Sequence, residues 1–349
     1  MFPESVILTL DLGTTMTKAA LWSDDGFVAV GRAPLTTTHP APDRAEQDPA
    51  TWWSSVADAC AAARAAAPRA FAAVGALGFS AARQTLVAAT AAGDPIGPGL
   101  LWSDRRAVAE AGDLAVAAGG SEAVRRHTGI PLNGGSVAAK AAWLWAHEPE
   151  RAAAARWLLS PRDLVAWRLT GELATDPTLA SATGLYDPSG TPMVALAGEW
   201  SDRLPPAIPS TSVLGRVRPA AAAELGLRTG LPVVIGAGDR QCEAIGAGAS
   251  PERPVVSWGT TANVSMPMDD WPDPLPAGIA VTRSATGGWL LEGGLSAAGT
   301  LLSWLATLTA TGGDELLRQA AGRPPGARGV VAVPWLGGAR APWWRDGTG

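Results

Sequence analysis

The sequence predicts an α/β protein of two related domains, and three observations support this prediction. Residues 6–22 form an apolar run and an alternating run around a glycine turn, which is typical of a strand hairpin. Residues 255–266 repeat the pattern, with Gly259, Thr260 and Thr261 at the tip. Between the hairpins, buried apolar strands lead into polar loops. The repeat indicates two domains, each of which offers one loop to a phosphate chain.

The tip of the first hairpin carries groups that suit phosphates. Asp11, Gly13, Thr14 and Thr15 supply a carboxylate, a backbone that a ligand can approach closely, and two hydroxyls. Amides and hydroxyls suit phosphate oxygens, and Asp11 suits a hydrated Mg²⁺. An ordinary hairpin explains this tip equally well when it is taken alone, so the prediction depends on the repeat.

The composition excludes several classes of protein. A chain of 349 residues is long enough for two domains with large cores. The net charge is −5 and 17% of the residues are charged, which argues against a nucleic-acid surface. Cys60 and Cys242 cannot build a disulfide framework and lack metal-ligand spacing, which fits a reducing cytoplasm. Residues 294–313 are uncharged but rich in Gly, Ser and Thr, so we expect a buried helix near a ligand rather than a membrane span.

Caps and periodic runs predict the elements between the hairpins. The expected elements are a strand over 28–35, a helix over 48–67 with Asp48 as N-cap, a strand over 74–79, a helix capped by Ser103 or Asp104, a helix over 134–146 that carries Lys140, a helix from the capping box at 160–163 to Gly171, a strand over 231–238 and a helix over 244–249.

Three polar or aromatic side chains follow predicted strands, where α/β proteins place ligand groups. Arg83 is either a surface charge or a fixed donor aimed at hydroxyls. Trp102 is either a core residue or a platform for a sugar ring, and both interpretations stay open. Asp239 is poorly explained by packing, so we expect it to accept a proton from a substrate hydroxyl.

Taken together, segments along the whole chain resemble the FGGY family of carbohydrate kinases, which includes xylulokinase, gluconate kinase and glycerol kinase. The order and spacing of the segments are specific, and LWSDRR and GAGD carry most of the resemblance. The segments are residues 11–18, 46–49 with 52–53, 79–85, 101–106, 161–187, 236–248, 257–261 and 334–342. The resemblance implies the two-domain actin-like ATPase fold (ribonuclease H-like), with nucleotide in the cleft between the domains.

The resemblance also implies ATP and Mg²⁺ as cofactors. The residues that it places at the nucleotide are Asp11, Gly13, Thr14, Thr15, Lys18, Gly259, Thr260, Thr261, Gly299 and Ser303. The residues that it places around the acceptor are Arg83, Gln84, Trp102, Asp239 and Arg240. Mg²⁺ is expected at Asp11, through water, and at Asp239, which also serves as the catalytic base.

The implied reaction transfers the γ-phosphoryl group of ATP to a hydroxyl of a small sugar, polyol or sugar acid, most closely as in xylulokinase. Catalysis of this kind depends on positioning, charge neutralisation and a base on the attacking hydroxyl. Closure of the two domains then excludes water. We expect a small-molecule partner, no nucleic acid and no membrane, and a homodimer is left open.

The chain departs from the family pattern at two places. Arg240 stands where xylulokinases and glycerol kinases usually carry a neutral amide. It either binds a carboxylate or phosphate on the substrate or forms a salt bridge with a nearby acid. We also expect a first domain over residues 1–245 and an incomplete second domain over 246–349, without the glycine-rich adenosine loop. The expected chain is therefore truncated or a fragment, with weak sugar binding at most and little kinase activity alone.

Two other functional classes remain as alternatives. One is a catalytically inactive member of the same fold that serves as a sugar-responsive binding or regulatory module. The other is an actin-like or chaperone-type ATPase without a small acceptor. Sugar-dependent release of ADP separates the kinase from the inactive member, and sugar-independent hydrolysis would favour the ATPase.

Overall fold

The chain folds into two compact units, which we describe separately from a computed structural model of residues 6–193, 196, 198–336 and 338–345. Unit 1 comprises Met1–Glu243 and Thr282–Gly287, and unit 2 comprises Ala244–Val281 and Gly288–Gly349. The domain boundary expected between residues 245 and 246 stays a prediction. Residue 337, in the last segment of the family resemblance, lies outside the described residues.

Unit 1 is built on a six-stranded sheet in the order β3-β2-β1-β5-β10-β9. The central strands β1, β5 and β10 run parallel, whereas β2, β3 and β9 pair antiparallel with their neighbours. The strands are β1 (Val6–Leu12), β2 (Met16–Ser23), β3 (Gly26–Pro34), β5 (Val74–Ala81), β9 (Val213–Arg216) and β10 (Pro232–Gly238). The hairpin and the two buried strands predicted from the sequence are therefore present in one sheet.

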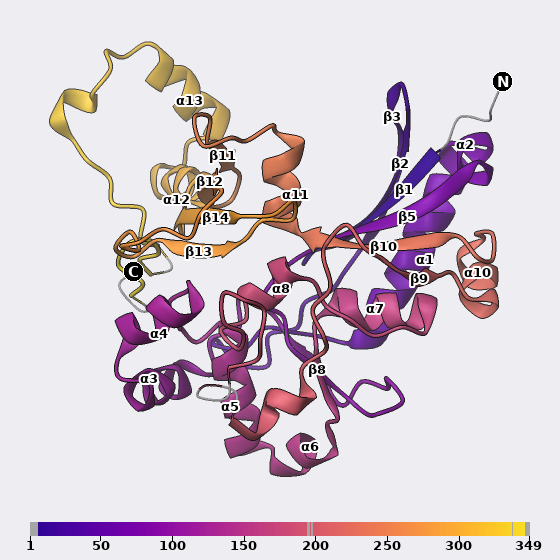
Figure 1. Cartoon of the computed structure of the whole chain (residues 1–349). Helices are drawn as coiled ribbons and strands as arrows, with labels where there is room; N and C mark the ends of the chain where they lie inside the picture. Colours follow the sequence, from indigo (N-terminus) through magenta and orange to yellow (C-terminus); the bar gives the residue numbers. More distant parts are fainter. Residues whose placement is uncertain (1–5, 194–195, 197, 337, 346–349) are drawn as a thin grey trace. The chain divides into compact units, whose positions relative to one another are not determined.

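A layer of helices covers this sheet, and Figure 1 shows α1 lying along it. The layer contains α1 (Pro49–Ala66), α7 (Pro161–Thr170) and α10 (Pro219–Leu225), which contact one another. Gly31 of β3 lets α1 approach closely, because a Cβ at that position would lie 2.0 Å from the Ala59 carbonyl oxygen. The apolar side chains of these helices and of the sheet form the main core.

The rest of unit 1 is mostly helical and is inserted between β5 and β9. Its helices are α3 (Val108–Ala117), α4 (Ser121–Thr128), α5 (Val137–His147), α6 (Pro149–Ala154), α8 (Pro177–Ser181) and η1 (Gly198–Arg203), whereas the short α2 (Pro68–Ala72) precedes β5. Two short strand pairs join it, β4 (Glu46–Gln47) with β7 (Gly99–Leu100) and β6 (Val87–Ala89) with β8 (Trp157–Leu159). A second core forms here around Leu86, Leu144 and Tyr186.

Several cap predictions are confirmed. The Asp48 side chain accepts a hydrogen bond from the Ala50 amide at the start of α1. Ser160 and Asp163 form the predicted capping box of α7, and Gly171 ends that helix in the left-handed conformation. Each cap involves residues that are close in sequence, so it can be predicted from the sequence alone.

Three predictions of helix position or burial are wrong. The helix after Trp102 begins at Val108, because the buried Asp104 carboxylate binds the Ala45 amide and the Arg106 side chain instead of capping a helix. The helix expected over 244–249 is α11, and it spans Asp239–Gly246. The helix expected to be buried within 294–313 is α12 (Gly299–Thr309), in which no described residue is buried.

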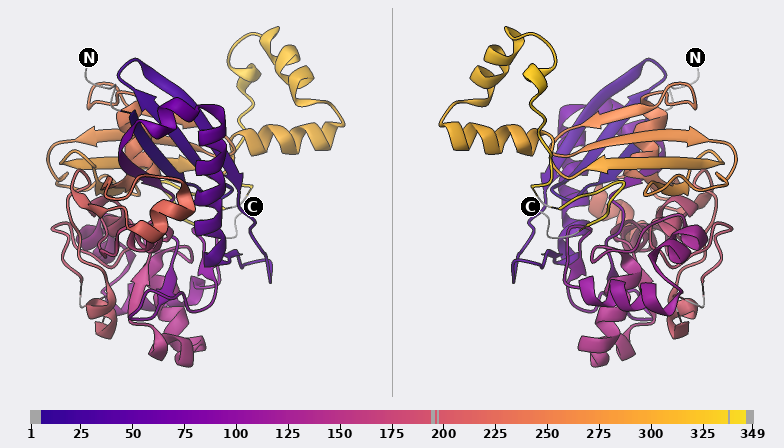
Figure 2. Two further views of the ribbon diagram at one scale, coloured as in Figure 1. Left: turned by 90° about the vertical axis from the view of Figure 1, so that its right-hand side faces the viewer. Right: turned by 90° about the vertical axis from the view of Figure 1, so that its left-hand side faces the viewer.

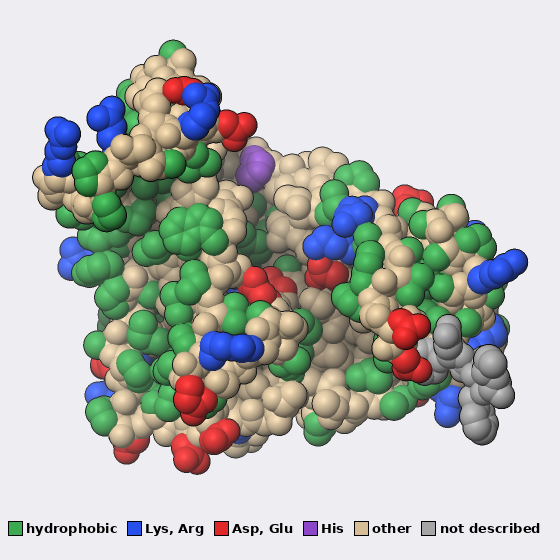
Figure 3. Space-filling model, turned by 90° about the horizontal axis from the view of Figure 1, so that it is seen from above, with side chains coloured by type: hydrophobic (Ala, Val, Ile, Leu, Met, Phe, Trp, Pro, Cys, Tyr) green, Lys and Arg blue, Asp and Glu red, His purple; other side chains and the backbone are tan. Residues whose placement is uncertain are grey.

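Unit 2 contains a four-stranded sheet in the order β11-β12-β14-β13. Its elements are β11 (Val255–Trp258), β12 (Ala262–Met268), β13 (Ala280–Arg283), β14 (Trp289–Leu295), α12, α13 (Gly313–Ala321) and η2 (Ala327–Gly329). Figure 2 shows α13, in yellow, standing away from the sheet, and none of its residues is buried. Apolar side chains remain on the surface of this unit (Figure 3), among them Val256, Trp258 and Leu308.

A β-bulge in β10 sets the end of that strand. The pairing with β5 shifts between Val234 and Ala237, and Gly236 within the bulge has a φ of +71°. A Cβ on Gly236 would lie 1.9 Å from the Phe79 carbonyl oxygen, so only glycine fits. After the bulge, Ala237 pairs with Ser80, which determines where the following residues leave the sheet.

We predict that Gly236→Ala destabilises unit 1 by more than about 2 kcal/mol, because it combines a disfavoured φ with a backbone clash. Gly78→Ala is the matched control, since Gly78 lies in the neighbouring strand with nothing within 4 Å of its added Cβ. Thermal unfolding of both variants checks this. Equal melting temperatures for the two would show that the bulge does not require glycine.

Candidate active site

The carboxyl ends of three neighbouring parallel strands meet at one edge of the sheet in unit 1. Asp11 of β1 lies opposite Ser80 of β5, and Ser80 lies opposite Ala237 of β10. The residues that follow these strands therefore leave the sheet side by side, as at ligand sites of other α/β proteins. This edge brings Asp11, Arg83 and Asp239 into one region.

Asp11 is held by one hydrogen bond on each carboxylate oxygen. The Ser80 hydroxyl donates to Oδ1 over 3.0 Å, and the Lys18 ammonium contacts Oδ2 over 3.0 Å. Lys18 lies opposite Asp11 in the hairpin register, so the hairpin itself creates this ion pair. The Asp11 side chain remains 30% exposed, and a carboxylate that is both oriented and open can receive a hydrated cation.

The Thr14 loop is tied to the loop that carries Trp102. The indole Nε1 of Trp102 donates to the Thr14 hydroxyl over 2.9 Å, and the Gln47 amide donates to the Thr14 carbonyl over 2.6 Å. Gln47 is held in turn by the Trp52 indole at 2.8 Å. Trp102 is half-buried, so it is not fully enclosed in the core, and its role as a sugar platform stays a prediction.

Asp239 is the first residue of α11, where the helix dipole favours a carboxylate. Its Oδ1 accepts from the Arg240 amide over 2.8 Å and lies 3.5 Å from Nε of Arg83. The Asp239 side chain is 44% exposed, against 15% for Arg83. The structure therefore presents an exposed acid that a mostly covered guanidinium orients.

The pKa of the Cys242 thiol in α11 is influenced by both acids. The pKa of this thiol is raised to about 11, mainly by burial and also by the carboxylates of Asp176, Asp239 and Asp11, whereas a hydrogen bond with Ser80 opposes the rise. The thiol is therefore protonated at neutral pH and unsuited to act as a nucleophile. Asp11 and Asp239 both act electrostatically on the same half-buried thiol.

A buried ion pair between Arg162 and Asp176 stabilises the end of β10. Arg162 is fully buried, and its guanidinium donates to the Ile235 carbonyl over 2.7 Å and to Asp176 over 2.8 Å. Burial alone would lower the pKa of Arg162, but Asp163 and Asp176 outweigh it and the pKa is raised. The charged guanidinium is thus a permanent part of this support.

Thr178 links this buried ion pair to Gly238, the residue before Asp239. The Thr178 hydroxyl donates to Asp176 over 2.6 Å and accepts from the Gly238 amide over 2.8 Å. The Ser210 hydroxyl also donates to Asp176, over 2.7 Å. This chain of hydrogen bonds fixes the backbone at Gly238, and so it fixes where α11 begins.

Our reading of the sequence missed most of these supporting residues. Arg162 and Asp176 fall within the segment that resembles the family, but no role was assigned to either. The available signals were a charged residue among apolar ones in α7 and the Asp-Pro pair that opens α8, with Asp176 as its cap.

Gln84 and Arg240 were predicted to contact the acceptor, and the structure gives each a partner within the protein. Gln84 has a φ of +60°, and its side-chain amide donates to the Ala182 carbonyl over 3.2 Å. The Arg240 guanidinium pairs with Glu243, three residues on, at 3.0 Å. The salt-bridge alternative for Arg240 is therefore the one present in the structure.

In unit 2 the predicted phosphate loop contacts the start of α12. The Gly299 amide donates to the Gly259 carbonyl over 2.9 Å, and the Thr300 amide and hydroxyl both reach the Thr260 carbonyl. A Cβ on Gly299 would lie 2.9 Å from the Gly259 carbonyl oxygen, so glycine permits this approach. The Ser303 hydroxyl donates back to the Gly299 carbonyl over 3.1 Å.

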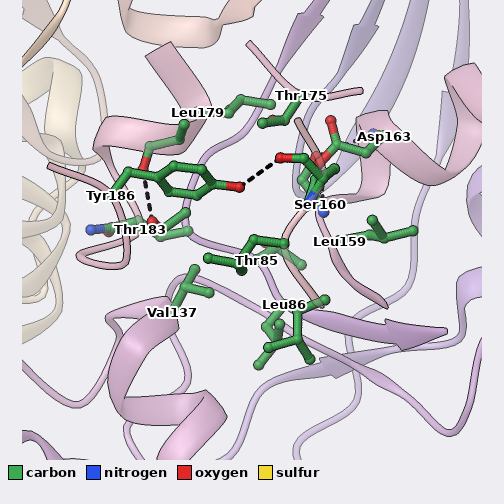
Figure 4. Close-up of a pocket in the computed structure, with 15 residues that line it drawn as sticks. Thr85, Leu86, Val137, Leu159, Ser160, Asp163, Thr175, Leu179, Thr183 and Tyr186 are labelled. Atoms are coloured by element: carbon green, nitrogen blue, oxygen red, sulfur yellow. Dashed lines mark hydrogen bonds between the residues drawn. The ribbon is translucent and has the colours of Figure 1, made fainter. Parts of the chain in front are cut away.

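Two cavities in unit 1 do not match a sugar site at the strand ends. One, shown in Figure 4, has a volume of about 30 Å³, is lined by Gln84, Asp163 and Tyr186 among others, and has the size of a few water molecules. The other, of about 440 Å³, is lined by Trp53, Trp167 and Arg218 and contains none of the predicted site residues. The strand-end cluster remains the candidate because its partly exposed acids, Asp11 and Asp239, lie where three neighbouring strands end and are each oriented by a cation.

The described part of the chain shows neither a metal cluster nor a membrane span. It contains no group of three or more acidic, His or Cys side chains that could hold a metal ion. A Mg²⁺ that keeps its waters and binds phosphates needs only one or two protein carboxylates, which Asp11 and Asp239 offer. In the same residues, no helix combines the length and apolar character needed to cross a bilayer.

Residues 6–246 match the N-terminal domain of the FGGY family of carbohydrate kinases. The chain belongs to this family. It is 32% identical over 344 residues to the xylulose kinase of Streptomyces rubiginosus and 28% identical over 360 residues to the gluconokinase of Bacillus subtilis strain 168. Each alignment covers 97% of this chain, with 68% of the first relative and 69% of the second.

The fold is confirmed by a solved structure. The xylulose kinase of Rhodospirillum rubrum superimposes with a TM-score of 0.89 at 30% sequence identity, covering 97% of this chain and 71% of that one. The α/β fold of the family is therefore present. The same coverage confirms the expectation that the second domain is incomplete relative to the solved kinase.

We predict that Thr178→Val destabilises unit 1 by about 1–3 kcal/mol, because it leaves the Gly238 amide buried without its acceptor. Thr51→Val serves as control, since the Thr51 hydroxyl makes only an exposed bond within its own helix turn. Chemical unfolding of both variants measures the difference. A Thr178→Val protein as stable as the control would show that Thr178 does not support the end of β10.

Proposed function

We propose that this protein is an ATP-dependent sugar kinase of the xylulokinase type, with Asp239 as its catalytic base. The observation that carries the proposal is the exposed Asp239 carboxylate, oriented by Arg83 at the same sheet edge as Asp11. We assign Asp239 to the acceptor hydroxyl, and Asp11 to the phosphates and their cation. Membership of the family supports the reaction class.

Asp239 has the properties of a general base for a sugar hydroxyl. Its side chain is 44% exposed, so it can contact a substrate, whereas Asp163 and Asp176 are buried and already paired. Arg83 and the Arg240 amide orient its carboxylate at Oδ1, so that it can accept the proton of an attacking hydroxyl. Because the base is already oriented, little further entropy is lost when the acceptor hydroxyl reaches it.

The residues at the tip of the first hairpin fit a nucleotide with Mg²⁺. Asp11 would take the cation through water, and Lys18, with its side chain 46% exposed, would neutralise phosphate oxygens. Asp239 offers a second carboxylate to the cation. When bound, Mg²⁺ neutralises the charge of the phosphates during transfer.

The ion pair of Arg240 favours a neutral acceptor. A guanidinium already paired with Glu243 would have to leave that partner to bind a carboxylate on a sugar acid. The similarity to a xylulose kinase points the same way, whereas the similarity to a gluconokinase does not. We therefore propose a ketopentose such as D-xylulose as acceptor, with Trp102 and Gln84 beside it.

A coupled assay of ADP formation tests the proposed function. D-xylulose, glycerol and gluconate are compared on the 349-residue chain and on a chain extended to the length of its relatives. Sugar-dependent ADP formation with D-xylulose as the best acceptor is expected from the extended chain, with weak turnover from the shorter one. Sugar binding without turnover in both would favour the inactive sugar-responsive module.

We predict that Asp239→Asn lowers kcat by about 10²–10⁴-fold in the form that turns over, because the hydroxyl loses its base. The KM for the acceptor is expected to change little, since asparagine keeps the shape and one hydrogen-bonding oxygen. Arg240→Gln is the control, as its guanidinium faces Glu243. If Asp239→Asn stays within a few-fold of the parent, Asp239 is not the base.

A further inference from the structure

A buried lysine lies behind the two loops that carry Gln84 and Trp102. Lys140 is on α5 and is fully buried, and its ammonium donates to three main-chain carbonyls. The Nζ–oxygen distances are 2.5 Å to Gln84, 2.8 Å to Leu101 and 3.4 Å to Leu100. The side chain thus joins two segments that an isolated β-bridge between Leu86 and Leu100 also connects.

We propose that Lys140 is a positioning residue of the acceptor site, whose ammonium fixes the Gln84 loop and the Trp102 loop relative to each other. The proposal rests on the proposed function, because Gln84 and Trp102 are the acceptor contacts that it would place. Nothing in the sequence pattern or the family resemblance assigned this role to Lys140.

The arrangement matches an ammonium group and no other basic side chain. Three carbonyl oxygens around one nitrogen satisfy three N–H donors, and a compact ammonium on a flexible stem can reach all three. Arginine would bring a larger planar group with five donors into a fully buried space. Of the 27 basic residues in the chain only two are lysines, Lys18 and Lys140. Lysine is therefore rare among the basic residues of this chain, and one of the two lysines occupies this buried position.

The bond to Gln84 acts on a residue in an uncommon conformation. With φ at +60°, Gln84 lies in the left-handed region, which costs free energy for a residue with a side chain. The Lys140 ammonium binds its carbonyl from one side, and the Ala182 carbonyl binds its side chain from the other. Loss of the ammonium would allow the loop to relax and would displace the Gln84 amide.

The same geometry makes the loops sensitive to pH. The pKa of Lys140 is lowered from 10.5 to about 7, mainly by burial; Asp104 opposes this change, and Arg105 and Arg106 contribute to it. These three groups come from the loop after β7, and Lys140 itself bonds to carbonyls rather than to a carboxylate. As pH rises through this pKa, the neutral amine retains two donors for three carbonyls. The tie between the loops therefore weakens above neutral pH.

Amide hydrogen exchange tests the tie without any substrate. The Leu86 and Leu100 amides bond each other's carbonyls, and the Leu101 amide bonds the Ala45 carbonyl. In Lys140→Met, protection at these amides is expected to fall about tenfold. Leu144→Met, one turn further along α5 and also buried, is the control for a general change of packing and should leave them within about threefold.

Binding of D-xylulose, followed by calorimetry on the same proteins, tests the role in acceptor recognition. The affinity of the parent should fall as pH rises from 6 to 9, and Lys140→Met should bind about tenfold more weakly at pH 6 with no pH response. Unchanged loop protection together with parental affinity in Lys140→Met would overturn the proposal. If the parent itself binds no sugar, the proposed function fails, while the exchange data still decide whether Lys140 ties the loops.

A parent-only measurement covers the case in which Lys140→Met does not fold. Selective ¹³C labelling of lysine gives two Cε signals, which Lys18→Met assigns. The Lys140 signal should titrate with a midpoint near 7, and loop protection should fall over the same pH range. Protection that stays constant while Lys140 loses its proton would contradict the proposal.

Discussion

The buried ion pair between Arg162 and Asp176 is the interaction on which the candidate site depends. Both side chains are fully buried, so each charge would be strongly destabilising without its partner. Arg162 binds the Ile235 carbonyl directly, and Asp176 reaches the Gly238 amide through Thr178. The end of β10 is thus fixed at Ile235 and at Gly238, and these contacts position Asp239, the next residue.

The site divides into groups that are fixed and groups that stay open to solvent. Arg162, Asp176 and Lys140 are fully buried and satisfied by protein atoms. Asp11 and Asp239 are partly exposed, and Lys18 and Arg83 respectively orient them. Phosphoryl transfer is accelerated mainly by positioning and charge stabilisation, so this division suits the proposed reaction.

The sequence predicted the parts of the fold that local patterns encode. The hairpin around Asp11, the capping box at Ser160 and the two central strands each depend on residues close in sequence. The supports could not be predicted in this way, because their partners are distant. Arg162 binds a carbonyl 73 residues away, and Lys140 binds one 56 residues away.

The errors have equally physical causes. Asp104 looked like a helix cap, but its carboxylate is buried and bonds to Ala45 across 59 residues. The start of α11 was placed too late because Asp239 was read as the end of a loop, although an acid in a first helical turn is favourable. Burial of α12 was expected because residues 294–313 are uncharged and rich in Gly, Ser and Thr, but no described residue of that helix is buried.

The most direct test of the account follows the phosphoryl group itself. ³¹P NMR would monitor ATP and D-xylulose with the chain extended to the length of its relatives, beside its Asp239→Asn variant. The account predicts a phosphomonoester signal that grows in step with ADP in the parent and is nearly absent in the variant. Inorganic phosphate growing in step with ADP, without a phosphomonoester and regardless of the sugar, would show an ATPase and contradict the account.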